Sequence, residues 1–239
     1  MAVLYSARFD TADLAQVARS EILSCRVYRA GALVAPTQAG STVTIYDENG
    51  EAVVTAGAVT VTDSIATYTL LGTVTDDYDP SAQWRIVWSL VISTITYTFD
   101  NRLILCRRVP FPVLTEAGIY ARVPALDPTG HAPISRRTEY SVTIDDAWIR
   151  LTNRLVESGR RIELITDPSV LRECHLLLVL AQVFDDLAAR LNESHGIAAA
   201  AFRAQYEAAW GSLVLPTDTD DNDGRPDVEQ VARGPVWAM

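Results

Sequence analysis

The chain has 239 residues, 49% of them hydrophobic, which is enough for two modest domains with real cores. Its formal net charge is −10, and all 20 of its basic residues are arginines. A chain this acidic is a poor general binder of nucleic acid, because phosphate contacts need clustered cations.

The cysteines and the apolar segments exclude further classes. Cys25, Cys106 and Cys174 are scattered, and their spacing matches neither a metal site nor a disulfide framework, so we expect reduced thiols and cytoplasmic synthesis. The N-terminus has no signal-peptide pattern, and no segment is long and apolar enough to predict a transmembrane helix.

Residues 1–20 form an N-terminal arm with two interpretations. Asp10 or Thr11 could cap a short helix through Leu14 and Val17. The same residues also fit an extended arm that joins a neighbouring sheet.

Residues 21–108 change to a period of two with many β-branched side chains, which is typical of strands. The expected strands are residues 22–28, 41–46, 52–55, 59–62, 65–71, 84–92, 94–99 and 103–107. Asn49-Gly50 predicts a tight turn, because both residues tolerate positive φ. The strand at 84–92 places Trp84, Trp88 and Leu90 on one face and should be central in its sheet. Strands at this spacing predict an immunoglobulin-like antiparallel β-sandwich, in architecture only, since the cysteines do not fit the usual disulfide.

A stiff boundary, Val109-Pro110-Phe111-Pro112, precedes a helical domain at residues 113–212. A short helix is expected from Thr115 or Glu116 to Arg122. The next helix is amphipathic, because apolar residues recur at spacings of three and four: Tyr140, Ile144, Ala147, Trp148, Leu151 and Leu155. Gly159 follows as its C-terminal cap.

Asp167-Pro168 opens the following helix, since Asp caps the free N–H groups and Pro fits the first turn. This helix is apolar almost all round, and Gly196 is expected to end it. A third helix runs through Ala198, Phe202 and Trp210. The second helix is more apolar than a three-helix bundle needs, which predicts burial against neighbouring subunits.

Residues 213–239 form an extended acidic tail with too little apolar content to fold alone. With Gly224 at the sixth position, the tail partly matches a calcium loop, whose ligands stand at alternate positions. The candidate ligands are Asp221, Asp223, Arg225 (through its carbonyl) and Asp227. Thr219 and Gln230 do not suit the first and last positions, so the alternative is a solvated acidic linker with no cofactor.

Catalytic signatures are absent from the sequence, and we expect no enzyme activity. His175 is expected to be a core or interface histidine, and no nucleophile turn, phosphate loop or zinc motif is present. Arg160-Arg161 either complements the end of its helix or binds an acidic partner surface. Val236 and Trp237 are candidate docking residues on the tail.

Two runs in the helical half carry a resemblance to a known family. They are Tyr140-x6-Ala147-Trp148-x2-Leu151-x3-Leu155-x3-Gly159-Arg160-Arg161 and Asp167-Pro168-x2-Leu171-x3-His175-x2-Leu178-x5-Phe184, with Tyr206 beyond. The chain from about residue 113 resembles head–tail connector (adaptor) proteins of long-tailed bacteriophages. The resemblance implies a homo-oligomeric ring, normally of twelve copies, that binds the portal protein and a tail terminator or stopper protein. Minimal connectors are only helical, so the sandwich departs from the family.

The sequence therefore predicts an α+β multidomain virion protein made in the host cytoplasm: an immunoglobulin-like β-sandwich, a small helical bundle and an extended C-terminal tail. As a head-to-tail connector it would line part of the DNA channel, pass genomic DNA without specific binding and contact no membrane. One alternative is a surface or carbohydrate-binding sandwich, with Tyr46, Tyr68, Tyr78 and Tyr97 as a sugar platform if they are exposed side by side. Capsid decoration or another tail component are further alternatives.

Overall fold

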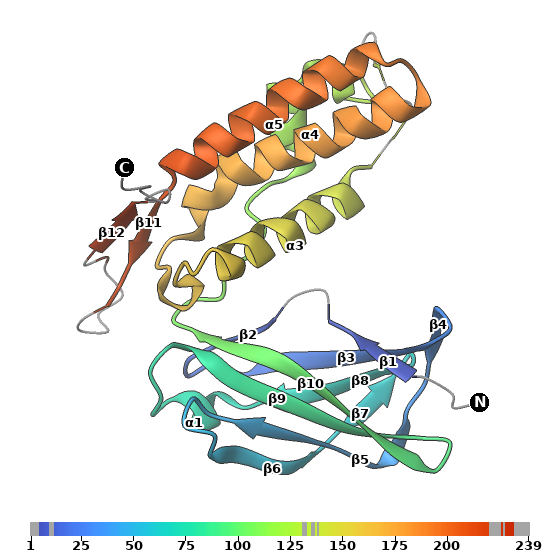
Figure 1. The fold of residues 1–239 in the computed structure, drawn as a ribbon, viewed down its shortest axis with the longest axis vertical. Coiled ribbons are helices and arrows are strands. Elements are labelled where there is room, and N and C mark those ends of the chain that lie inside the picture. Colours follow the sequence, from blue (N-terminus) through green and yellow to red (C-terminus); the bar gives the residue numbers. More distant parts are fainter. Residues whose placement is uncertain are drawn as a thin grey trace, which may run out of the picture. The chain divides into compact units, whose positions relative to one another are not determined.

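The structure is a computed structural model that describes residues 5–9, 12–130, 133–134, 137, 139–219, 226 and 228–231. The chain divides into two units (Figure 1). The β unit comprises Met1–Val109 and Arg161–Leu164, and the helical unit comprises Pro110–Arg160 and Ile165–Met239. The first division falls at the boundary that the prolines predict, because X-Pro restricts the preceding residue and stiffens the link.

Two five-stranded sheets make up the β unit. The first has the order β1 (Tyr5–Arg8), β3 (Glu21–Arg29), β8 (Ile65–Leu70) and β7 (Thr60–Thr62), with β4 (Ala32–Val34) also pairing with β3. The second has the order β2 (Asp13–Gln16), β10 (Ile95–Cys106), β9 (Ser81–Ile92), β5 (Thr37–Tyr46) and β6 (Ala52–Ala58). In the described residues β2 runs parallel to β10, and the other pairings of these sheets are antiparallel.

The core of the β unit comes from side chains of both sheets. Alternate residues of β9 are buried, as the period of two predicts: Trp84, Ile86, Trp88, Leu90 and Ile92. At the β5–β6 turn, Gly50 has a φ of +83°, and the Asp47 carboxylate accepts hydrogen bonds from the N–H groups of Asn49 and Glu51 at 2.9 Å. The turn therefore lies where Asn-Gly predicts it.

Two strand predictions change in the structure. The segments expected at 94–99 and 103–107 are one long strand, β10, with a register irregularity between Leu103 and Leu105. The described part of the N-terminal arm is extended: β1 pairs with β3 and β2 pairs with β10. Of the two interpretations, the extended arm is confirmed and the helix through Leu14 and Val17 is wrong. The backbone hydrogen bonds that this arm makes with β3 and β10 outweigh its weak local preference for a helix. Asp10 and Thr11 lie outside the described residues. The β unit also contains the short helix α1 (Gly72–Thr75) and the 3-10 turn η2 (Ile162–Leu164).

The helical unit contains α2 (Glu116–Arg122), η1 (Pro124–Leu126), α3 (Ser141–Glu157), η3 (Pro168–Leu171), α4 (Arg172–Arg190) and α5 (Ser194–Ser212). The apolar face predicted for α3 is buried, as is Tyr140 before it. Gly159 has a φ of +71° and ends α3 with bonds from Gly159 N to Val156 O and from Arg160 N to Leu155 O. Asp167 caps a helix start as expected, but that start is η3, and α4 follows it.

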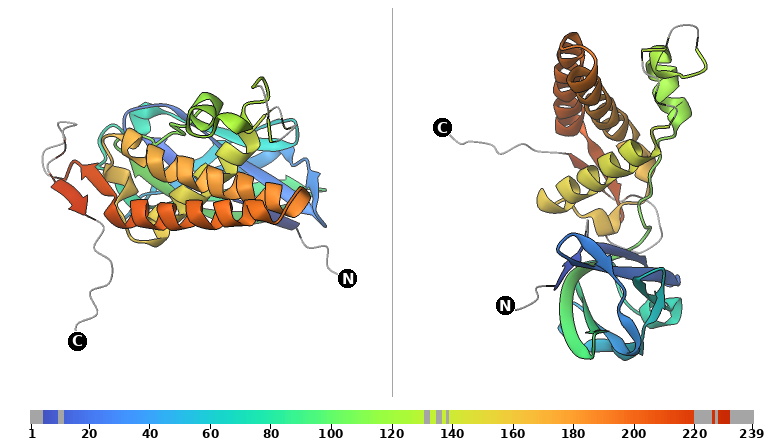
Figure 2. Two further views of the ribbon diagram at one scale, coloured as in Figure 1. Left: turned by 90° about the horizontal axis from the view of Figure 1, so that it is seen from above. Right: turned by 90° about the vertical axis from the view of Figure 1, so that its right-hand side faces the viewer.

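The α4–α5 connection differs from the prediction. The chain turns at residues 191–193, where the Asn192 side chain accepts a hydrogen bond from Ser194 N at 2.9 Å. Gly196 therefore lies in the first turn of α5 and does not end α4. A polar side chain that satisfies a free N–H defines the helix start here. Figures 1 and 2 show α4 and α5 side by side, as this short connection requires.

The apolar surplus expected on α4 is used mainly inside its own unit. Ten of its residues are buried: Cys174, His175, Leu176, Leu177, Val179, Leu180, Ala181, Val183, Phe184 and Leu187. Side chains from α2, α3 and α5 cover them, for example Ile119, Ile144 and Ala199. In α5, by contrast, only Ala199 and Tyr206 are buried. Uncovered apolar surface is therefore found on α5 rather than on α4.

The described part of the C-terminal segment is not simply an extended tail. Residues of β11 (Val214–Thr217) pair antiparallel with β12 (Val228–Val231). Thr217 also bridges to Ile165, and Thr166 N donates to Pro216 O at 3.1 Å. Leu213 and Leu215 are buried. Apolar residues at 213–215 therefore anchor the beginning of this segment. The acidic composition of the segment as a whole does not indicate this anchor.

Candidate functional site

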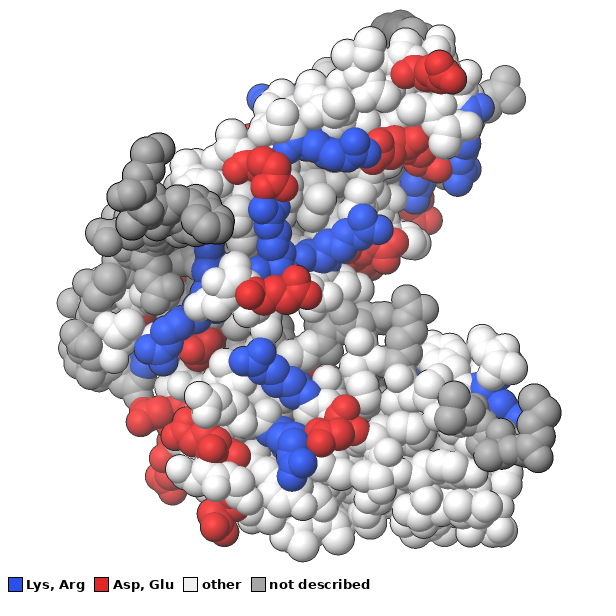
Figure 3. Space-filling view, viewed as in Figure 1, with Lys and Arg blue, Asp and Glu red and all other residues white. Residues whose placement is uncertain are grey.

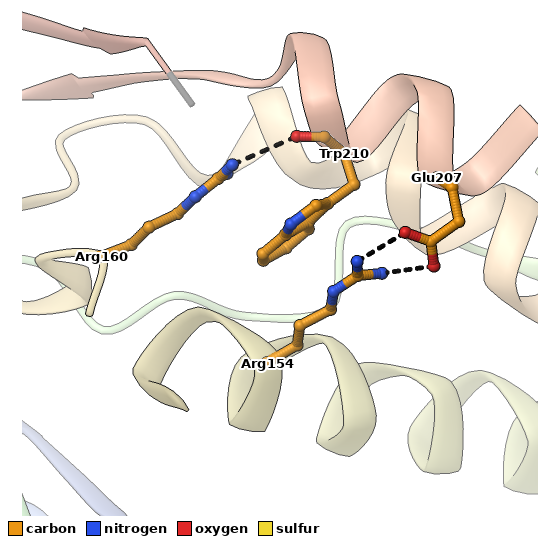
Figure 4. A network of polar contacts seen from close by, with 4 residues as sticks. All are labelled: Arg154, Arg160, Glu207 and Trp210. Carbon is orange, nitrogen blue, oxygen red and sulfur yellow. Dashed lines mark hydrogen bonds and ion pairs between the residues drawn. The ribbon is translucent and has the colours of Figure 1, made fainter. Parts of the chain in front are cut away.

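A network of stacked and paired side chains joins the C-terminal ends of α3 and α5 (Figure 4). The Arg154 guanidinium donates two hydrogen bonds to the Glu207 carboxylate, at 2.8 and 2.6 Å. The same guanidinium lies 4.4 Å from the ring centroid of Trp210, and the Arg160 guanidinium lies 4.1 Å from that centroid. Both cations therefore stack on one indole.

Arg160 has a specific role at the end of α5. Its Nη2 donates to the carbonyl oxygen of Trp210 at 3.1 Å, one of the last carbonyls of α5, which also accepts the C-cap N–H of Leu213 at 3.3 Å. Arg160 was expected to complement the end of its own helix or to bind an acidic partner. In the structure it complements a helix end fifty residues further along the chain.

Charges in this network are shifted by their contacts. The bidentate bond to Glu207 raises the pKa of Arg154, and the same bond lowers the pKa of Glu207. Burial lowers the pKa of Arg160 and raises the pKa of Tyr206. Nη1 of Arg160 is buried and has no hydrogen-bond partner among the described residues. These groups are suited to holding helices together, and they include no nucleophile beside a base.

Arg161 belongs to the β unit and differs from its neighbour. Its Nε donates to the buried carboxylate of Glu163 at 2.9 Å, and 51% of its side chain remains exposed. The backbone of Glu163 accepts from Arg107 N at 2.8 Å, which ties η2 to the end of β10. The guanidinium of Arg161 is thus accessible at the surface of the β unit.

A groove of about 320 Å³ runs over α4 between α3 and α5. Its lining includes the apolar side chains of Leu178, Ala181, Ala204 and Tyr206, together with charged side chains of all three helices: Arg150, Asp185, Arg203 and Glu207. Arg203 pairs with Asp185 across the α4–α5 contact. On the face drawn in Figure 3, basic and acidic side chains alternate over the helical unit.

Two polar groups in this groove lack partners. Nε2 of Gln182 is buried and unbonded among the described residues. Arg150, on the α3 rim, makes no ion pair with another described residue. Because a buried amide donor without an acceptor costs free energy, the groove favours an occupant that supplies acceptors.

The end of the α4–α5 hairpin carries exposed apolar side chains. Leu191 is 61% exposed and Ile197 is 78% exposed, and the exposed Glu193 lies between them in sequence. A second hollow, of about 720 Å³, is lined nearby by Leu187, Leu191 and Arg190, with Asp186 bridging Arg137 and Arg190.

His175 is buried, as expected for a core histidine. Its Nε2 donates to the carbonyl oxygen of Ile144 at 2.9 Å, and its ring packs on Trp148. Burial lowers its pKa, so the ring is neutral at pH 7. Burial also raises the pKa of Cys174, beside it, to about 11, so this thiol is not an activated nucleophile.

The calcium-loop residues and the docking residues of the tail lie outside the described residues: Asp221, Asp223, Arg225, Asp227, Val236 and Trp237. Calcium binding stays a prediction, and calorimetry of the whole chain with millimolar calcium tests it. In the described residues no group of three or more His, Cys, Asp or Glu side chains is arranged to hold a metal ion.

The four tyrosines considered as a sugar platform are half-buried and contact different neighbours. Tyr46 packs under Arg85, and Tyr78 packs edge-on against Trp84. Tyr97 packs against Tyr5, and Tyr68 lies beside Gly57. Sugar platforms present aromatic faces together, and these rings are engaged separately.

Comparisons of the sequence with models of protein families and with curated proteins find no match. Among the described helices, none has the length and apolarity to cross a membrane.

Proposed function

We propose that this protein is a virion structural protein: a head-to-tail connector (adaptor) whose copies form a ring, without catalytic activity. The ring joins the portal protein to a tail terminator or stopper protein and encloses part of the DNA channel. By resemblance to the connector family it holds twelve copies. The protein is made in the host cytoplasm, acts at the head–tail interface of the virion and contacts no membrane.

The uncovered apolar end of the α4–α5 hairpin is the observation that carries this proposal. Leu191 and Ile197 expose most of their side chains, although the helical unit already buries ten residues of α4. Large apolar side chains grouped on an exposed helical end are typical of contact surfaces between subunits. A ring of identical subunits supplies such a contact for every copy.

The charge of the chain supports a channel that DNA passes without binding. A net charge of −10, with no lysine in the sequence, gives copies in a ring a shared negative field. Specific or tight binding of DNA would need clustered basic groups on the channel wall. The described helical face instead alternates the two signs (Figure 3).

The β unit fits an immunoglobulin-like sandwich, which we propose as its class. Strands β1, β3, β8 and β7 follow the A-B-E-D order of that architecture. Strands β10, β9, β5 and β6 follow the G-F-C-C′ order. The described cysteines are free, so a packed core replaces the usual disulfide. In a connector this unit would decorate the ring or brace the capsid vertex.

The C-terminal segment and Arg161 are proposed to dock on the portal. Arg161 keeps an exposed guanidinium, whereas Arg160 is engaged with Trp210 and is no longer proposed for docking. Val236 and Trp237 provide apolar anchors on a segment that gains affinity when many copies bind together.

Negative-stain microscopy of the protein mixed with its portal protein tests the proposal. A second ring stacked on the portal is expected. Truncation after Val231 should release the ring, and it spares the buried Leu213 and Leu215, which a larger truncation would remove. Bare portals beside free protein would refute the connector function.

A carbohydrate-binding module or a capsid decoration protein remains the alternative. The first has little support, because the four tyrosines expected to form its platform are half-buried beside different neighbours. The carbohydrate-binding alternative would be favoured if the whole chain binds glycans and if adding portal protein does not change that binding.

A further inference from the structure

The groove over α4 and the exposed end of the α4–α5 hairpin are different surfaces of one helical unit. The groove offers apolar side chains, Leu178 and Ala204, beside Nε2 of Gln182, which has no acceptor among the described residues, and the guanidinium of Arg150. The hairpin end, defined here as Leu191, Glu193 and Ile197, offers apolar side chains beside a carboxylate. We propose that the hairpin end of one copy docks in the groove of a second copy. This inference rests on the proposed ring and names the contact that builds it.

Charge complementarity selects a second copy as the occupant. The carboxylates of the groove are paired within the unit, Glu207 with Arg154 and Asp185 with Arg203, and Arg150 makes no ion pair with another described residue. The hairpin end presents an acceptor in the exposed carboxylate of Glu193, and the dipoles of the α4 C-terminus and the α5 N-terminus oppose each other there. A docked hairpin end would therefore supply acceptors to Gln182 and Arg150, as well as apolar contact to Leu178.

The contact is directional, because each copy inserts its hairpin end into one neighbour and accepts the hairpin end of another neighbour in its groove. Such a heterologous contact repeats from copy to copy, and it closes into a ring when the rotation between copies divides a full turn. A two-fold contact would instead stop at a dimer. The direction of the contact can therefore be tested without a structure of the assembly.

Sedimentation velocity of the full chain, alone and with portal protein, tests the proposal with two variants. Ile197→Asp disables the hairpin end and Ala204→Arg obstructs the groove. Both side chains are exposed, so neither change removes core packing, and thermal melting verifies the fold. Each variant is expected to weaken assembly at least about tenfold. The matched control is Ala208→Arg, an exposed alanine of α5 outside the groove, which should assemble as the wild type does.

Mixing the two variants gives the decisive result. Ile197→Asp retains its groove and Ala204→Arg retains its hairpin end, so the mixture should form heterodimers that grow no further. Exchange of charges between Arg150 and Glu193, in the paired substitution Arg150→Glu with Glu193→Arg, should restore the assembly that Arg150→Glu weakens.

Two outcomes would overturn the inference in distinguishable ways. If the wild type assembles and both single variants assemble equally well, the subunit contact lies elsewhere and the connector function stands. If the wild type stays monomeric both alone and on the portal, this contact and the proposed function both fail.

Discussion

The carboxyl group of Asp13 should make the stability of the β unit depend on pH. Asp13 lies on β2, and its Oδ2 accepts a hydrogen bond from Asn101 Nδ2 at 3.0 Å. Burial raises the pKa of Asp13 from 3.8 to about 6, and the hydrogen bond from Asn101 offsets only part of this rise. Burial, with the charge of Asp13 adding to it, also raises the pKa of the Cys25 thiol to about 12.

The sign follows from proton binding. The unfolded chain releases the proton of Asp13 near pH 3.8, whereas the folded chain retains it to about pH 6. Stability therefore falls as the pH rises through this window, and the cost is complete above it. Since one pKa unit is worth about 1.4 kcal/mol, the charged group costs at most about 3 kcal/mol at pH 8 and about half that at pH 5.

Asp13→Asn removes the charge and keeps an acceptor for Asn101. The variant should be more stable than the wild type by up to about 3 kcal/mol at pH 8 and by about half that at pH 5. Urea unfolding followed by tryptophan fluorescence measures the difference, since Trp84 and Trp88 lie in this core. Comparison at equal pH cancels the titration of other groups.

The control for this prediction is Asp100→Asn, an exposed carboxylate on β10 that pairs with Arg85. It should change stability by less than about 0.5 kcal/mol at either pH. A gain for Asp13→Asn that is equal at pH 5 and pH 8 would assign the effect to packing. A loss at pH 8 would refute the burial of a costly charge at this position.

Three further experiments test the helical unit by chemical denaturation. Gly159→Ala should lower the free energy of unfolding by about 1 kcal/mol, because a φ of +71° strains any side chain, although nothing lies near the added Cβ. The control Gly211→Ala, which has open space and a helical backbone, should raise the free energy of unfolding by up to about 1 kcal/mol. Equal effects of the two substitutions would contradict the left-handed cap at Gly159. Leu180→Ala should cost about 2 to 5 kcal/mol, since this side chain is fully buried in the centre of the unit, and a cost below 1 kcal/mol would refute that packing. A double-mutant cycle with Arg154→Gln and Glu207→Gln should give a coupling of about 0.5 to 1 kcal/mol, because the pair is bidentate but partly exposed, and no coupling would show that it is fully screened.

Local signals predicted much of the secondary structure. The apolar spacing of α3, the cap at Gly159 and the alternation along β9 depend on residues that are neighbours in sequence. Each of these features is decided by backbone conformation and by which side of an element meets the core, so the sequence pattern is sufficient.

Features that depend on distant partners could not be predicted in this way. The N-terminal arm is extended because β3 and β10 offer it hydrogen bonds from residues far along the chain. Arg160 lies beside Trp210 only after α3 and α5 have folded together. The groove is likewise lined by α3, α4 and α5, and no spacing in the sequence indicates that Nε2 of Gln182 would find no acceptor among the described residues.

Composition and periodicity are enough to indicate a strand-rich half and a helical half, a boundary at Val109-Pro110 and an excess of acidic charge. These properties depend only on composition and on the spacing of residues along the chain, so they do not depend on where each residue lies in the fold. Tertiary structure alone decided which apolar side chains remain uncovered, because burial is a property of neighbours. Ten residues of the apolar helix α4 are buried within its own unit, whereas Leu191 and Ile197 at the hairpin end are exposed.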